Sequence, residues 1–227
     1  MGRAWTLTLT ALAMAAFAAN SILCRAALAR GSVDPASFTL VRIVSGAAML
    51  WLIALALRRG QAPRGSWRGA FALFAYAAAF SFAYVSLPAG VGALLLFGAV
   101  QATMILVGIV RGERPTPVQA LGLFLALGGL AALVAPGVSA PPLAGSALML
   151  TAGVAWGAYS ILGRSGGDPL LATAGNFWRA APIALVLVPL AIAGGPPSTG
   201  LVYGVLSGAI ASGRGVSFIA SVRNRLG

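Results

Sequence analysis

The chain is a succession of apolar runs of about 20 residues, separated by short stretches that contain Pro, Gly and Arg. A run of this length, wound into a helix that rises about 1.5 Å per residue, crosses the roughly 30 Å of hydrocarbon in a bilayer. The runs do not alternate apolar and polar residues as membrane-spanning strands do, so the pattern favours helices. The sequence therefore predicts an all-α, polytopic bundle of transmembrane helices.

Eight spans follow from where the apolar runs begin and end. Pro182 and Pro189 interrupt the backbone hydrogen bonds of the seventh span, so we expect that helix to be kinked. Pairs of glycines four residues apart, at 108 and 112, at 153 and 157, and at 204 and 208, predict close helix packing. The predicted spans are 4–23, 35–57, 69–87, 89–110, 118–135, 143–162, 170–193 and 200–220.

Composition supports a lipid surrounding. Hydrophobic residues make up 59% of the chain and charged residues 8%, with a mean hydropathy of +0.95. Soluble domains carry about a quarter charged residues. The net charge of +12 comes from arginines, which in a soluble protein would indicate nucleic acid. Here they lie at the ends of spans, so we expect contacts with anionic membrane lipids and none with nucleic acid.

The arginines are unevenly divided between the two sides of the membrane. If the N-terminus is cytoplasmic, ten of the arginines that lie in the connections and the two chain ends fall on the cytoplasmic side, and only Arg25 and Arg30 fall outside. Positive charge is retained in the cytoplasm, so this bias predicts an inner-membrane protein with both ends in the cytoplasm. The N-terminal run is too long for the apolar core of a signal peptide, and we interpret it as the first span.

Two segments far apart in the chain are similar. SILCR at 21–25 ends the first run, and SILGR at 160–164 ends the sixth. An Asp-Pro pair follows each copy, at 34–35 and at 168–169. In such a pair the Asp carboxylate can cap the first N–H groups of a helix while Pro occupies its first position. Chance can produce the pentapeptide between apolar helices, but the ordered set favours a duplication.

The duplicated unit spans the membrane an odd number of times. Each Asp-Pro pair opens a span that soon carries an arginine, Arg42 or Arg179, and the copies begin at spans one and six. A five-span unit enters the membrane in opposite orientations in its two copies, as in many secondary transporters. The sequence therefore predicts a first repeat over 1–137 and a second, inverted repeat over 138–227.

Few residues could carry chemistry. The chain has no His, a single Cys, and the acidic residues Asp34, Glu113 and Asp168, none of them deep inside a span. This excludes zinc hydrolysis, paired-carboxylate catalysis and Cys-His chemistry. We expect no enzyme, no catalytic residue, no metal and no cofactor.

Polar and aromatic side chains inside the spans remain as candidates. Arg42 lies about seven residues, or roughly 10 Å, into its span. Either it extends to the outer head groups, or it anchors an anionic solute group or the carbonyls of a helix end. The polar and aromatic candidates could line a cavity, or could contact neighbouring helices and the interface. The predicted cavity residues are Asn20, Arg42, Gln101, Trp156, Tyr159 and Arg179.

Two stretches carry a resemblance to a known family. FTLVR at 38–42 and GVGALLLFGAVQATMILVGIVRGERPTPVQALGLFLALGG at 90–129 resemble EamA-type members of the drug/metabolite transporter superfamily, and the similarity extends over about 5–213. The resemblance implies ten helices, both ends in the cytoplasm and a central cavity that carries amino acids, other metabolites or drugs. The proline often found midway along the family's fourth helix is missing around 98–102.

The second repeat is expected to be incomplete, since about eight of the ten implied helices are predicted. Arg214 falls where its repeat counterpart is Ala83, and an arginine at mid-membrane costs roughly 2.5–3.5 kcal/mol. We therefore expect a truncated or frame-shifted relative of a full transporter. The predicted function is secondary transport of a small organic metabolite or drug by alternating access. The alternative is a non-transporting remnant or helical scaffold, and a homodimer is compatible with either.

Overall fold

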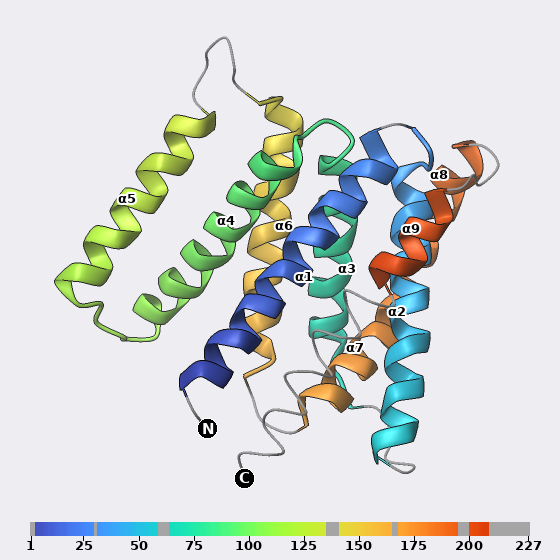
Figure 1. The fold of residues 1–227 in the computed structure, drawn as a ribbon, viewed down its shortest axis with the longest axis horizontal. Coiled ribbons are helices and arrows are strands. Elements are labelled where there is room, and N and C mark those ends of the chain that lie inside the picture. The colour runs from blue at the N-terminus through green and yellow to red at the C-terminus, as the bar shows by residue number, and fades with distance from the viewer. Residues whose placement is uncertain are drawn as a thin grey trace.

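The computed structural model describes residues 3–29, 31–58, 64–134, 141–164, 168–194 and 200–208. Within these residues the regular secondary structure is helical throughout and contains no strand. Successive long helices run up and down alternately, side by side (Figure 1). The predicted all-α helical bundle is confirmed.

The second to fifth helices lie close to their predicted bounds, whereas the first continues to Ala29, past its predicted end at residue 23. The third ends at Ala83 rather than at residue 87, because Ser86 and Leu87 donate backbone hydrogen bonds to the Ala83 carbonyl in a turn before Pro88. The helical conformation is disfavoured at a residue immediately before proline, here Leu87, so the third helix ends earlier than predicted. These helices are α1 (Arg3–Ala29), α2 (Pro35–Arg58), α3 (Trp67–Ala83), α4 (Ala89–Val110) and α5 (Pro117–Val134).

The predicted interruption of the seventh span is confirmed. Pro182 lies within α7, which ends two residues later, and a 3-10 turn separates it from the next helix. Proline removes a backbone donor and crowds the carbonyl of the preceding turn, so the helix cannot continue regularly. The remaining elements are α6 (Leu143–Leu162), α7 (Pro169–Ala184), the 3-10 helix η1 (Leu185–Leu187), α8 (Val188–Ala193) and α9 (Gly200–Leu206).

The predicted eighth span begins at Gly200, as expected, and is described as far as residue 208. The rest of that span, including Arg214, lies outside the described residues.

The two Asp-Pro pairs do cap helices. The Asp34 carboxylate accepts a hydrogen bond of 2.8 Å from the Ser37 backbone N–H at the start of α2. The Asp168 carboxylate accepts one of 2.9 Å from the Leu170 backbone N–H at the start of α7. Both bonds satisfy N–H groups that have no partner inside the helix.

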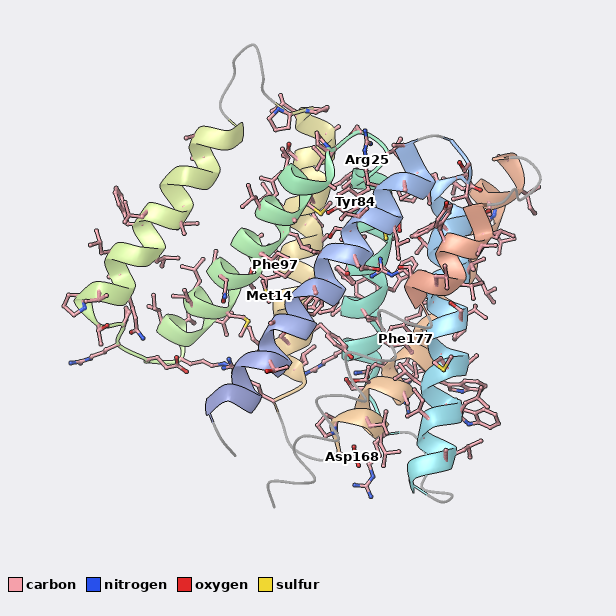
Figure 2. The ribbon with its side chains drawn as sticks, viewed as in Figure 1. Met14, Arg25, Tyr84, Phe97, Asp168 and Phe177 are labelled. Atoms are coloured by element: carbon pink, nitrogen blue, oxygen red, sulfur yellow. The ribbon has the colours of Figure 1, made fainter. Side chains whose placement is uncertain are left out.

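The helices that begin the two predicted repeats run in opposite directions. In Figure 1 α1 rises from the lower end to the upper end, whereas α6 descends from the upper end to the lower end. Figure 2 accordingly places Arg25 at the upper end and Asp168 at the lower end. Opposite directions are what an inverted repeat requires.

Two of the three predicted glycine pairs are helix contacts. A Cβ atom on Gly153 would lie 2.5 Å from the Ala99 Cβ, and one on Gly157 would lie 2.8 Å from the Thr103 Cβ. Only glycine allows α6 to approach α4 so closely. The pair at 204 and 208 similarly faces α2, where a Cβ on Gly204 would lie 3.2 Å from the Val41 Cγ1.

The pair at 108 and 112 is not a helix-packing motif, so that prediction was wrong. Gly112 lies beyond the end of α4 with a φ of +92°. Its N–H bonds to the Ile109 carbonyl at 2.9 Å, and the Glu113 N–H bonds to the Gly108 carbonyl at 3.0 Å. This double hydrogen bond is a Schellman motif, in which glycine adopts the left-handed conformation that ends a helix.

The buried core lies among α2, α3, α6 and α7, while the outer faces remain apolar. Four segments of the described chain are long and apolar enough to cross a membrane: Pro35–Ala56, Ala89–Val110, Leu143–Leu162 and Pro169–Ala193. α5 stands at one edge beside α4 (Figure 1), with Leu121 and Phe124 exposed. An apolar exterior around a buried core is suited to a lipid surrounding.

Candidate functional site

A small cavity lies where α1, α3, α4 and α6 meet. Its volume is about 10 Å³, which is close to the room that one water molecule needs. An organic solute does not fit in this conformation, so the helices must separate to admit one. The lining residues are Phe17, Asn20, Ser21, Tyr76, Phe80, Leu96, Phe97, Val100 and Trp156.

Aromatic rings form most of the cavity wall. The ring centroids of Tyr76 and Trp156 are 4.4 Å apart, at an interplanar angle of 68°. Phe17 packs edge-on against Phe97 at 5.9 Å and against Trp156 at 6.2 Å. Such contacts fix the rings and leave an apolar surface that suits the apolar part of a solute.

One end of the wall is polar. The Ser207 hydroxyl donates a hydrogen bond of 2.7 Å to the Asn20 Oδ1, and the Cys24 sulfur lies 3.8 Å from the same oxygen. All three side chains are buried. Asn20 itself lines the cavity, so this buried polar group lies at the cavity wall.

Arg42 points into the protein, not towards the head groups. Its side chain is 5% exposed, and its Nη2 donates a hydrogen bond of 2.8 Å to the Tyr76 hydroxyl. The guanidinium carbon lies 5.2 Å from the ring centroid of Tyr76 and 4.8 Å from that of Phe80. Its other terminal nitrogen, Nη1, is buried and bonds to no partner in the described part of the chain. Tyr76 thus connects Arg42 with the cavity.

The other candidates lie farther from the cavity. Tyr159 packs behind the wall, with its ring centroid 6.1 Å from that of Trp156. Gln101 is exposed, because one helical step after the cavity-lining Val100 turns the side chain by about 100°. The Arg179 Nη1 donates a hydrogen bond of 3.0 Å to the Gly175 carbonyl of its own helix. The structure therefore brings together Asn20, Trp156 and, through Tyr76, Arg42.

Sequence reasoning missed a row of three aromatic side chains along α3 and its C-cap, namely Tyr76, Phe80 and Tyr84. The Tyr76 and Phe80 ring centroids are 5.4 Å apart, and those of Phe80 and Tyr84 are 4.7 Å apart. Aromatic residues at 76, 80 and 84 share one helix face, and this four-residue spacing was the available signal. Ser207 gave no comparable signal, since its role depends on a contact with a distant helix.

Both ends of the bundle are closed by contacts between the two predicted repeats. At one end the Ser66 backbone N–H donates a hydrogen bond of 2.9 Å to the Asn176 Oδ1. A Cβ on Gly65 would lie 2.6 Å from the Gly175 carbonyl carbon there. At the other end, a Cβ on Gly200 would lie 2.6 Å from the Ser32 carbonyl oxygen. These contacts join the two predicted repeats at each end of the bundle.

Comparisons with known proteins agree with this architecture. The model of the EamA-like transporter family matches residues 4–135, which cover α1 to α5 except for Arg3. A Pseudomonas aeruginosa protein described as uncharacterized, PA1977, is 58% identical over 213 residues, covering 92% of this chain and 74% of the relative. No solved structure matches the chain. The chain is a multi-pass membrane protein that belongs to the EamA-like transporter family.

Proposed function

We propose that this chain is a secondary transporter that carries a small organic metabolite or drug across the inner membrane by alternating access, with its N-terminus in the cytoplasm. The observation that carries the proposal is the position of the cavity. Its walls come from helices of both predicted repeats, and contacts between the repeats lie at each end of the bundle. Secondary transporters bind their substrates at such a repeat interface.

The packing of the helices supports the inverted repeat on which this mechanism depends. α3 packs against α6 and α7, and α9 packs against α1 and α2. In terms of the repeats, the third helix of each unit contacts the first and second helices of the other unit. Such reciprocal contacts are expected when two similar units are related by a twofold axis in the membrane plane.

Alternating access would require the two closures to open in turn. Separation of α7 from the start of α3, where Asn176 meets Ser66, would open the cavity on the cytoplasmic side. Separation of α9 from the connection between α1 and α2, where Gly200 meets Ser32, would open it on the outer side. The cavity of about 10 Å³ corresponds to a state in which both are shut.

Flux in proteoliposomes tests the proposal. Purified chain is reconstituted, and uptake of labelled amino acids, small organic acids and aromatic drugs is measured with and without the same compound inside. We expect uptake of at least one class, accelerated by internal solute. No flux across the panel would contradict the proposal and favour the helical-scaffold alternative.

Two tryptophan variants serve as a matched pair. Trp156 lines the cavity, whereas Trp178 on α7 is 62% exposed. We expect Trp156→Ala to abolish uptake and Trp178→Ala to preserve it. Equal uptake by both variants would show that the solute does not pass this cavity.

A further inference from the structure

We propose that the solute bound at this cavity is a monocarboxylate with an apolar or aromatic body, and that Arg42 and Tyr76 bind its carboxylate. The inference deepens the proposed function, because it names the substrate class of the same site. It concerns binding, which is measured separately from transport.

The charge of Arg42 has no counter-ion among the acidic side chains of the chain. The sequence contains only three acidic residues. Asp34 caps the start of α2, Asp168 caps the start of α7, and Glu113 lies beyond the end of α4. None forms an ion pair with Arg42, whose Nη1 bonds to no described residue. A compensating negative charge must therefore come from outside these side chains.

The aromatic neighbours of this charge supply no negative counter-charge. Transfer of an ion from water into a protein interior costs free energy even after the surroundings relax. The faces of Tyr76 and Phe80 attract the guanidinium, and the Tyr76 hydroxyl accepts one hydrogen bond from it. An anion next to Nη1 would supply the missing partner.

The geometry favours a carboxylate of single charge. Arg42 presents one unpartnered nitrogen, and Tyr76 accepts a hydrogen bond from Arg42, which leaves its own O–H free to donate. These two donors fit the two oxygens of a carboxylate, a pairing that the planar guanidinium favours. A dianion such as phosphate would exceed the single positive charge and leave a net negative charge in an apolar interior.

The aromatic rings of the cavity wall determine which kind of solute body suits the site. The Tyr76 ring contacts Trp156 at 4.4 Å between centroids, and Trp156 contacts Phe17 at 6.2 Å. A solute whose carboxylate reaches Arg42 and Tyr76 would therefore place its body among these rings once the helices have separated. Apolar and aromatic bodies gain most from such a wall.

Equilibrium dialysis with the purified full chain in detergent tests the inference. The probes are labelled 3-phenylpropionate and its neutral isostere 3-phenylpropionamide, each used up to about 10 mM, since weak sites have a Kd near 1 mM. We expect saturable binding of the carboxylate, about tenfold tighter than that of the amide. Arg42→Gln should lose about tenfold in carboxylate affinity and leave amide binding unchanged, whereas Arg42→Lys should keep the preference for the carboxylate.

A matched control separates this site from general surface charge. Arg68→Gln removes an exposed arginine from α3 and should bind the carboxylate as the unmodified chain does. Thermal unfolding of each variant verifies that it is folded. Equal affinity for acid and amide, unchanged carboxylate binding in Arg42→Gln, or no saturable binding of either probe would each overturn the inference. Carboxylate binding without flux would instead contradict the proposed transport and leave the inference standing.

Discussion

The Ser207 hydroxyl donates a hydrogen bond of 2.7 Å to the Asn20 Oδ1, although 187 positions separate the two residues. Ser207 directly follows α9, so this buried bond joins the first helix of the chain to the last described segment. The repeat alignment that pairs Arg214 with Ala83 also pairs Ser207 with Tyr76, and Tyr76 contacts Trp156 on α6. Each predicted repeat thus places its third helix against the first helix of the other.

Loss of the Ser207 hydroxyl should destabilise the bundle. Hydrogen bonds between membrane helices contribute about 0.6 kcal/mol on average and up to about 1.7 kcal/mol. Because the Asn20–Ser207 bond is buried, we expect Ser207→Ala to lower the free energy of unfolding by about 1 kcal/mol. Thermal unfolding in detergent measures this change.

Ser160→Ala is the control for that prediction. The Ser160 hydroxyl bonds to the Trp156 carbonyl of its own helix at 2.9 Å, so its loss breaks no link between helices. We expect Ser160→Ala to change the free energy of unfolding by no more than about 0.5 kcal/mol. Equal effects of the two substitutions would show that the Asn20–Ser207 bond does not hold the repeats together.

Gly153→Ala should force α6 away from α4. The added Cβ would lie 2.5 Å from the Ala99 Cβ, whereas carbon atoms pack at about 3.5–4.0 Å. Overpacking of this kind costs about 1–3 kcal/mol, which a shift in thermal unfolding would report. Gly122→Ala on α5 meets nothing within 4 Å and should cause no loss of stability. A tolerated Gly153→Ala would contradict the close approach of α6 and α4.

Arg25→Gln should weaken the end of α3. The Arg25 Nη1 donates hydrogen bonds of 2.8 and 2.9 Å to the Tyr84 and Val85 carbonyls, which follow the last turn of α3 (Figure 2). Bonds from a charged donor contribute about 1.5–3 kcal/mol when buried, and these are partly exposed, so we expect a loss of about 1–2 kcal/mol. The repeat-related Arg164 is exposed, and Arg164→Gln should change the free energy of unfolding by much less.

Under the proposed mechanism, a disulfide between the start of α3 and α7 should stop transport. The variant Ser66→Cys/Asn176→Cys, with Cys24→Ser, places two thiols where the Ser66 backbone and the Asn176 side chain now bond at 2.9 Å. Oxidation should block flux in proteoliposomes, and dithiothreitol should restore it, because the proposed cycle requires this contact to open. The two single variants, oxidised in parallel, control for other effects of the oxidant. Undiminished flux through the fully oxidised double variant would show that this closure is not a gate.

Helix bounds were largely predictable because strong local signals mark them. α4 and α6 have their predicted bounds, each preceded by a proline that serves as its N-cap residue. The capping roles of Asp34 and Asp168 and the break after Pro182 also followed from local chemistry. These features depend on neighbouring residues, which a sequence displays directly.

The composition of the site was less predictable. A membrane helix is apolar on every side, so periodicity does not indicate which face meets a neighbouring helix. For that reason the sequence could not show that Asn20 and Trp156 line the cavity whereas Gln101 and Arg179 do not. The partner of Arg42 likewise depends on how α2 and α3 rotate against each other.

Thiol labelling in intact cells tests the inverted arrangement of the two repeats most directly. In a Cys24→Ser background, Ala29→Cys at the exposed end of α1 and Arg164→Cys after α6 report the side of the membrane on which each connection lies. We expect a membrane-impermeant maleimide to label Ala29→Cys in intact cells and Arg164→Cys only after permeabilisation. Labelling of both residues from the same side would contradict the inverted repeat and, with it, the alternating-access mechanism.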